Sequence, residues 1–366
     1  MRTGKNGAPE ERPGLMKMMF MKRLLPGRNA MLFCALTAGL SLLLFLFAPA
    51  ASAAAKTPKP TATPAPTLAP PQEAWPELPP LTEDGYLAED AGQDEFIHTD
   101  VENGLWLYIS PGLRVEIKRY GDPNIPLIWY EADIRTAGED RLHSVPAKAD
   151  RVDRALNFPE TIARRSQVVF GINDDQFGQR KINGKTIGMV VRSGKVYGSS
   201  SRKSGGTGYP NLETLALFPD GGLKVYESRE YSAQEYIDMG AVDVFAFGPI
   251  LIRDGVINER LASYKEKDKQ PRCSLGMVEP YHYVSVVVDG RHKGSEGANL
   301  MWLAQRLKDL GATQALNLDG GNTSAMVFMG ERLNSSSGAG PDGLVRSISG
   351  LVAIGTSAKV PEYQAK

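Results

Sequence analysis

Two aspartates, each placed between an apolar run and a glycine, are the residues of this sequence best suited to chemistry. Residues 286–291 read Val-Val-Val-Asp-Gly-Arg, and residues 316–321 read Leu-Asn-Leu-Asp-Gly-Gly. A carboxylate fixed at the end of a buried strand can serve as an acid, a base or a metal ligand, and a glycine beside it lets a ligand approach the backbone. Asp289 and Asp319 are therefore candidate catalytic residues. The alternative is that both motifs are turns, because Asp-Gly is a common turn dipeptide.

The segment between the two aspartates predicts the element that must position them. Residues 299–310 carry an apolar stripe of leucines, Asn299 can cap a helix there, and a glycine follows its last residue. A strand–helix–strand unit results. If its two strands are parallel neighbours, Asp289 and Asp319 emerge at the same edge of a sheet, where they could act on an anionic sugar or hold a metal ion.

Two further motifs place polar residues at predicted strand ends. Asn173 and Asp175 follow the apolar strand predicted at 167–172, although an Asx turn is the alternative interpretation. Arg272 begins another strand after a proline, and its planar guanidinium suits a phosphate or a carboxylate; a solvent-facing strand residue is the alternative. The adjacent Cys273 is interpreted as a small core residue, because no histidine is evidently paired with it.

The composition and the motifs that are missing exclude several classes of protein. The chain has 366 residues, with 42 Lys and Arg against 42 Asp and Glu, so no net positive charge favours nucleic acid. The sequence contains no H-E-x-x-H zinc motif, no P-loop and no G-x-S-x-G nucleophile elbow. No metal site and no cofactor are therefore predicted, with a divalent cation held by the same aspartates as the alternative.

The first 84 residues predict export. Residues 1–53 combine a basic stretch, an uncharged apolar run at 30–51 and small residues, a pattern typical of a signal peptide or a signal anchor. Residues 54–84 are rich in Pro, Ala and Thr and are predicted to be a linker. We therefore expect an exported protein, extracellular or anchored at the outer face of a bacterial cell. It would contact the membrane through its N-terminal segment if that segment is not cleaved.

The remaining residues predict an α+β fold. A β-rich portion at 85–165 precedes the main domain at 166–357, and we expect mixed β-sheets with a few packed helices in a single large catalytic domain. Helices are predicted at 159–165 and 232–239 as well as at 299–310. Strands are predicted from apolar, β-branched and aromatic runs bounded by turn residues, at 105–109, 113–120, 127–135, 167–172, 188–192, 214–218, 223–226, 242–247, 273–278, 283–288, 314–318, 325–329 and 347–354.

Several of these segments, taken in order, resemble the phosphodiester glycosidase family. The most specific motif is Leu-Asn-Leu-Asp-Gly-Gly-Asn-Thr-Ser at 316–324. Three residues depart from the family pattern: Asp174 replaces a glycine, Cys273 a threonine, and Asn322 a glycine or serine. The other matching segments are 172–177, 188–196, 247–255, 271–276, 289–291 and 303–304, with Arg346 before the last strand.

The resemblance implies an exported hydrolase that cleaves a sugar-1-phosphodiester in cell-envelope or extracellular glycans, with a glycan or sugar phosphate as its partner. Asp319 and Asp289 would be the catalytic carboxylates, with Asp175 and Glu296 in reserve. The alternatives are a non-catalytic protein that binds cell-wall glycan and a protein of exopolysaccharide assembly. The residues expected to bind substrate are Asn173, Arg272, Arg291, Gly320, Gly321, Asn322, Thr323, Ser324 and Arg346.

Overall fold

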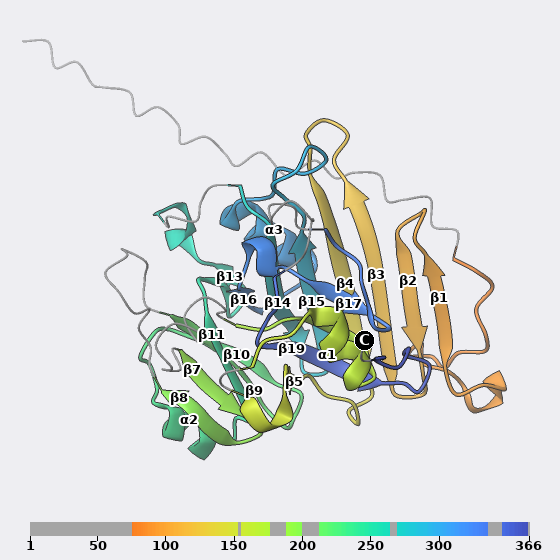
Figure 1. Ribbon diagram of the computed structural model, residues 1–366, viewed down its shortest axis with the longest axis horizontal. Coiled ribbons are helices and arrows are strands. Elements are labelled where there is room, and N and C mark those ends of the chain that lie inside the picture. The colour runs from red at the N-terminus through yellow and green to blue at the C-terminus, as the bar shows by residue number, and fades with distance from the viewer. Residues whose placement is uncertain are drawn as a thin grey trace, which may run out of the picture. The chain divides into compact units, whose positions relative to one another are not determined.

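The computed structural model describes residues 75–152, 155–175, 188–199, 212–263, 269–335 and 346–364 (Figure 1). All of them belong to one compact unit that extends from Ala62 to Lys366. The predicted signal or anchor segment at 1–53, and the predicted linker up to residue 74, lie outside the described residues. In the described ranges, no helix is both long enough and apolar enough to cross a membrane.

A nine-stranded sheet is the largest element of the fold. Its strands are β1 (Phe96–Asp100), β2 (Leu105–Ile109), β3 (Leu113–Gly121), β4 (Ile128–Thr136), β12 (Ile250–Arg253), β13 (Val256–Ile257), β14 (Arg272–Glu279), β15 (His282–Val288) and β16 (Gln314–Leu318). They pair in the order β1-β2-β3-β4-β15-β14-β16-β12-β13, and each of these pairs is antiparallel. The β-rich portion before residue 166 therefore contributes β1–β4 to the same sheet as β14–β16.

Two five-stranded sheets complete the β-structure. The second sheet has the order β10-β9-β11-β7-β8, and the third has the order β18-β17-β6-β19-β5. Their strands are β7 (Met189–Arg192), β8 (Lys195–Ser199), β9 (Glu213–Leu217), β10 (Leu223–Tyr226) and β11 (Asp243–Phe247) in the second sheet, and β5 (His143–Pro146), β6 (Val168–Asn173), β17 (Met326–Phe328), β18 (Glu331–Arg332) and β19 (Gly350–Thr356) in the third.

The described α-helices lie where the sequence predicts them. They are α1 (Pro159–Arg165), α2 (Ala233–Asp238) and α3 (Leu300–Asp309), with short 3-10 turns at Glu89–Ala91, Ala149–Arg151, Glu259–Ser263 and Gly321–Thr323. The predicted cap of α3 is confirmed, because Oδ1 of Asn299 accepts the N–H of Trp302 at 2.8 Å. Helix α3 lies against one face of the nine-stranded sheet (Figure 1). Its leucine stripe shares a core with residues of that sheet.

The opposite face of the nine-stranded sheet shares a core with the two smaller sheets. This core contains Leu275 and Leu316 from the large sheet, Leu215 from the second sheet, and Phe170 and Met326 from the third. Each of these side chains is fully buried. The predicted α+β class in a single large domain is therefore confirmed, and the strand pairs described within it are antiparallel.

The predicted strands are all present, with their ends shifted by a few residues. Six strands are absent from the predictions: β1, β5, β8, β12, β13 and β18. Five of them bury at most one residue, so no buried apolar run marks them, whereas β12 is a buried apolar strand of four residues that the prediction missed. The packed part of the chain also begins earlier than predicted, because Trp75 and Leu78, inside the predicted linker, pack against Leu107 and Ile109 of β2.

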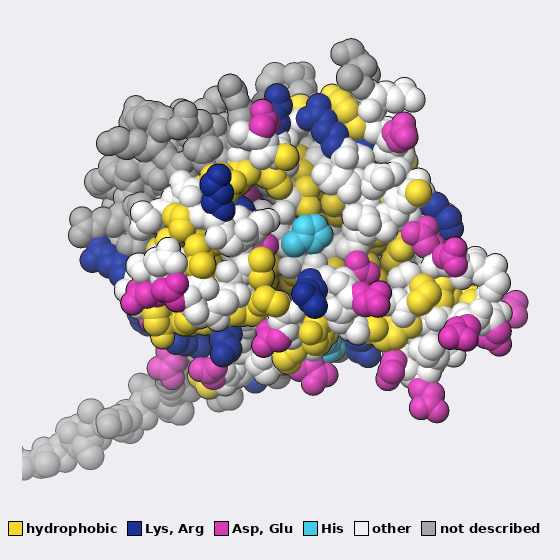
Figure 2. Space-filling view, turned by 90° about the horizontal axis from the view of Figure 1, so that it is seen from below, with side chains coloured by type: hydrophobic (Ala, Val, Ile, Leu, Met, Phe, Trp, Pro, Cys, Tyr) yellow, Lys and Arg dark blue, Asp and Glu magenta, His cyan; other side chains and the backbone are white. Residues whose placement is uncertain are grey.

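On the face in Figure 2, acidic and basic side chains are interspersed among neutral ones, in keeping with a net charge of zero.

Candidate functional site

Two carboxylates lie at one edge of the nine-stranded sheet. β15 and β16 are parallel to each other, but β14 runs between them in the opposite direction. The ladder pairs Val288 with Arg272, and Leu318 with the next residue of β14. Asp289 and Asp319 therefore leave the sheet on either side of the start of β14. The expected common edge is present, whereas the two strands are not the direct neighbours that the prediction assumed.

The loops that follow β15 and β16 are fastened to each other. Arg291 has a φ of 65° and donates from Nη1 to Oδ1 of Asn322 at 3.0 Å. Asn334 donates from Nδ2 to the carbonyl oxygen of Ser324 at 3.0 Å, and its side chain also hydrogen-bonds Asp289. The two Asp-Gly motifs, about thirty residues apart in the sequence, thus belong to one polar network.

Asp289 is a buried carboxylic acid, with 2% of its surface exposed. Its Oδ1 accepts the N–H of Ser335 at 2.9 Å, and its Oδ2 lies 3.4 Å from Oγ of Ser335 and 3.9 Å from Nε2 of His292. Burial raises the pKa of Asp289 to about 7, outweighing the bonds from Ser335 and the charge of Arg332, which lower it. A carboxyl group that titrates near neutral pH can take up and release protons, as a general base or acid must.

Asp319 is half-buried and is held through its backbone by Asn173. The Nδ2 of Asn173 donates to the carbonyl oxygen of Asp319 at 2.8 Å, while its Oδ1 accepts the N–H of Ala325 at 2.9 Å. The Oδ1 of Asp319 accepts the N–H of Gly320 at 2.9 Å. Asn173, which ends β6 and is 1% exposed, thus fastens both ends of the loop after β16 to the third sheet.

Replacing Asn173 by alanine is expected to lower the free energy of unfolding by about 2–3 kcal/mol, because the substitution removes its bonds to Asp319 and Ala325. Urea unfolding of the variant and the wild type measures this difference. Asn103→Ala is the matched control, because Asn103 is exposed and bonds only a surface aspartate in the described part of the chain. Equal losses in the two variants would contradict the framework role of Asn173.

The glycines of the second loop allow it to pass close to the start of β14. Gly321 has a φ of 66°, and its N–H donates to the carbonyl oxygen of Pro271 at 2.9 Å. A Cβ on Gly320 would lie 2.8 Å from the same oxygen, and a Cβ on Gly321 would lie 3.1 Å from Nη2 of Arg291. Thr323 closes the turn by donating from Oγ1 to the carbonyl oxygen of Gly320 at 2.6 Å. The loop therefore packs too closely against Pro271 and Arg291 to leave room for a side chain at either position.

The predicted arginines come from three segments around this edge. Arg272 is 4% exposed and donates from Nε to the carbonyl oxygen of Ala298 at 3.1 Å. Arg291 and Arg346 are exposed, and the N–H of Arg346 donates to the carbonyl oxygen of Asn322 at 3.3 Å. Backbone and side-chain contacts thus bring Arg291 and Arg346 to the loop that carries Asn322.

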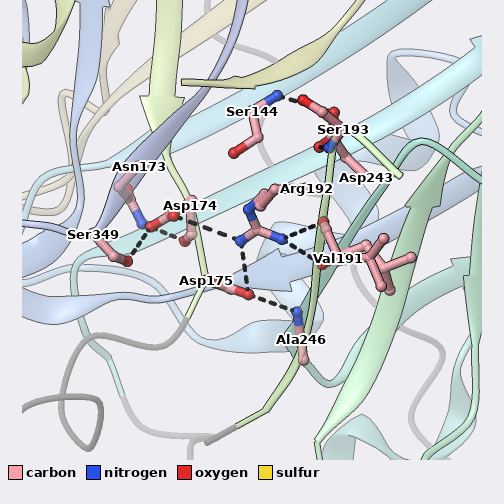
Figure 3. Close-up of polar contacts among 11 residues, drawn as sticks. Ser144, Asn173, Asp174, Asp175, Val191, Arg192, Ser193, Asp243, Ala246 and Ser349 are labelled. Atoms are coloured by element: carbon pink, nitrogen blue, oxygen red, sulfur yellow. Dashed lines mark hydrogen bonds and ion pairs between the residues drawn. The ribbon is translucent and has the colours of Figure 1, made fainter. Parts of the chain in front are cut away.

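Asp174 and Asp175 lie in a second polar cluster, around Arg192 of β7 (Figure 3). Nη2 of Arg192 is 3.1 Å from Oδ2 of Asp175 and 3.7 Å from Oδ2 of Asp174. Nη1 of Arg192 donates to the carbonyl oxygens of Val191 and Val244. All three charged residues are at least 95% buried, so this is an internal ion pair rather than an open binding surface.

This cluster joins the end of β6, in the third sheet, to β7 and β11 of the second sheet. The N–H of Ala246 in β11 donates to Oδ2 of Asp175 at 3.1 Å, and Ser349 donates from Oγ to Oδ1 of Asp174 at 2.7 Å. The guanidinium of Arg192 also stacks on Phe245, with Cζ 4.1 Å from the ring centroid. Asp175 is therefore engaged in holding the β6 end against the second sheet.

Glu296 and Cys273 belong to neither of these two polar clusters. The carboxylate of Glu296 is 53% exposed and forms an ion pair with Lys269 at 2.7 Å, at the surface. Cys273 is fully buried, and burial raises the pKa of its thiol well above the ordinary value, as expected for a core residue. In the described ranges, no group of three or more His, Cys, Asp or Glu residues is placed to hold a metal ion.

Sequence reasoning missed three residues that shape this region. Arg192 carries a signal in the sequence, because a charge at the end of the apolar run 189–192 must be paired if the strand is buried. Asn334 and Ser335 carry no such signal, because they belong to a polar stretch after a two-residue strand. Only the folded chain brings them to Asp289.

Comparison with known proteins gives a consistent result. The sequence model of the phosphodiester glycosidase family matches residues 166–354. A stretch of 190 residues is 29% identical to the SPbeta prophage-derived uncharacterized protein YomE of Bacillus subtilis (strain 168); it covers 51% of this chain and 28% of that protein. This chain thus spans little more than a quarter of the relative's length.

A solved structure with a similar fold is the catalytic domain of zebrafish N-acetylglucosamine-1-phosphodiester alpha-N-acetylglucosaminidase, auto-inhibited by its pro-peptide. The TM-score is 0.52 at 20% sequence identity, and the match covers 68% of this chain and 85% of that domain. This similarity supports the fold described above.

Proposed function

The chain belongs to the phosphodiester glycosidase family, and from this premise we propose that it hydrolyses sugar-1-phosphodiesters. The observation that carries the proposal is the sheet edge at which Asp289 and Asp319 flank Arg272, with Arg291 and Arg346 on the adjoining loops. In such a reaction, carboxylates can activate water or stabilise positive charge at the anomeric carbon of the sugar, and guanidinium groups can hydrogen-bond the phosphate.

The proposed reaction breaks the bond between the anomeric carbon and the phosphate oxygen. Water adds to the anomeric carbon, and the electron pair of the broken bond leaves on the phosphate oxygen, which gives a free sugar and a phosphate monoester. Because the leaving group is a stable anion, the site has to neutralise charge more than it has to donate a proton. Arg272, Arg291 and Arg346 are proposed to do so, and losing one such preorganised contact typically costs about 3 kcal/mol of transition-state stabilisation.

The two carboxylates are proposed to have different tasks. Asp289, whose pKa is raised to about 7 by burial, is proposed as the base that takes the proton of the attacking water. Asp319, half-buried beside the glycine loop, is proposed to stabilise the positive charge that develops on the sugar. Asp175 is proposed to position the β6 end through Arg192, and Glu296 is given no part in the reaction.

The proposal is tested with the purified full chain and a panel of sugar-1-phosphodiesters that differ in the sugar and in the alcohol. Glycosides of the same sugars without phosphate are the matched controls. We expect free sugar and phosphate monoester in equal amounts, from the phosphodiesters alone. If the chain binds these compounds without releasing sugar, and Asp289→Asn and Asp319→Asn bind them equally well, it is a glycan-binding protein and the proposal fails.

The setting of the reaction is proposed from the sequence. The basic, apolar and small-residue pattern of 1–53 supports export, and the Pro-rich segment 54–84 would separate the domain from a membrane. We therefore propose glycans of the cell envelope or the extracellular space as the source of substrates. Fractionation of cells that express the full chain tests the location.

A further inference from the structure

The loop after β15 is closed on itself and holds a histidine beside Asp289. His292 and Ser295 exchange backbone N–H···O bonds in both directions, at 3.1 and 3.0 Å. Oγ of the fully buried Ser295 donates to the carbonyl oxygen of Asp289 at 2.7 Å and accepts the N–H of Ile128 at 3.0 Å. These bonds fix the backbone of His292 relative to Asp289 without using the imidazole or the carboxylate.

A backbone contact determines which ring nitrogen of His292 carries the hydrogen. The N–H of Gly294 donates to Nδ1 at 3.2 Å, so the neutral ring has its hydrogen on Nε2. Nε2 is buried and has no hydrogen-bond partner among the described residues, and Oδ2 of Asp289 lies 3.9 Å away. A buried donor that lacks an acceptor is costly, and a small movement of the ring would give it one.

The other charged or titratable groups that face Asp289 are Tyr130 of β4 and Arg332 of β18. Arg332 is ion-paired with Glu160 of α1 at 3.4 Å. Burial, reinforced by the negative charge of Asp289, raises the pKa of Tyr130 to about 12, so its hydroxyl stays protonated at neutral pH. Nη1 of Arg332 is also buried without a hydrogen-bond partner among the described residues, but the guanidinium stays charged at neutral pH. Neither Tyr130 nor Arg332 therefore changes its charge in the pH range in which Asp289 titrates.

The geometry points to His292 as a positioning residue that stabilises the charged form of Asp289 by donating from Nε2 to Oδ2. This inference rests on the proposed function of Asp289 as the base. As the oxygen of water bonds to the anomeric carbon, its proton passes to Asp289, and the bond to phosphate breaks with its electrons leaving on the phosphate oxygen. Asp289 then returns the proton to solvent. Because a hydrogen bond to the charged form favours that form, His292 keeps Asp289 available as a base at lower pH than burial alone would allow.

The test compares His292→Phe, which removes the donor but keeps a ring, with His292→Gln, which keeps a donor. The exposed His143 supplies the matched control, His143→Phe. The first readout needs no activity: the carboxyl ¹³C signal of Asp289, assigned by its loss in Asp289→Asn, is followed against pH. We expect its midpoint to rise by about one pH unit in His292→Phe and to stay nearly unchanged in His292→Gln and in the control.

The second readout is the pH dependence of kcat. For His292→Phe we expect a loss of about tenfold at pH 6 that disappears toward pH 9, because the base is then charged without help. An unchanged ¹³C midpoint in His292→Phe, or an equal loss of kcat at every pH, overturns the inference. If the ¹³C midpoint shifts in His292→Phe but the wild-type protein shows no turnover, the pairing of His292 with Asp289 is supported and the proposed function is overturned instead.

Discussion

Asp289→Asn is expected to lower kcat about 100- to 10,000-fold and, at pH 8, to make the protein more stable than the wild type. The loss of activity follows from the removal of the proposed base. The gain in stability follows from burial, because asparagine can accept the N–H of Ser335 as the carboxylate does but has no charge to keep away from water.

The pH range of the stability gain follows from the raised pKa of Asp289. Below pH 3.8, the ordinary value, the carboxyl is protonated in the folded and the unfolded chain alike. Between pH 3.8 and about 7 the unfolded chain releases the proton while the folded chain keeps it, so the wild type loses stability as the pH rises. Above pH 7 the loss is complete, and it corresponds to at most about 4 kcal/mol.

Urea unfolding at pH 4 and pH 8 measures this effect. The stability of Asp289→Asn relative to wild type should rise between the two pH values, whereas Glu296→Gln, which removes an exposed carboxylate, should differ little from wild type at either pH and should keep its kcat. An Asp289→Asn variant that gains nothing between pH 4 and pH 8 would show that the carboxyl is not buried as described.

Arg192→Met is expected to lower the free energy of unfolding by about 3–5 kcal/mol. The substitution takes the positive charge of Arg192 away from the buried carboxylates of Asp174 and Asp175, and it removes the bonds that Nη1 donates to two strand carbonyls. Methionine fills a similar volume beside Phe245, so the loss reflects charge and hydrogen bonding more than a cavity.

Thermal and urea unfolding measure this loss, with Arg253→Met as the matched control. Arg253 pairs with Glu230 at 2.9 Å at the surface, where such a pair contributes less than about 1 kcal/mol. Combining Arg192→Met with Asp175→Asn should recover part of the stability, because one buried negative charge is removed together with the positive charge that faced it. Additive losses in the double variant would contradict the internal ion pair.

The sequence alone determined the elements that position the candidate site. The apolar runs before Asp289 and Asp319 predict β15 and β16, and the capped leucine stripe at 299–310 predicts α3. These features are local: strand and helix periodicity, a cap, and the Asp-Gly signal lie within a few residues of one another. The common edge of the two aspartates followed from the strand–helix–strand order, and the expectation that Arg272 matters followed from its place at the start of a strand after a proline.

Only the tertiary structure decided what surrounds each of these residues. It placed β14 between β15 and β16, set Asp175 against Arg192, and left Glu296 at the surface. It also brought Ser335 to Asp289 across 46 positions of the chain. Burial and hydrogen bonding depend on contacts between segments that are distant in the sequence, and burial raises the pKa of Asp289 toward neutrality. A local pattern can therefore identify a carboxylate at a strand end, but the fold decides whether that carboxylate can act as a base.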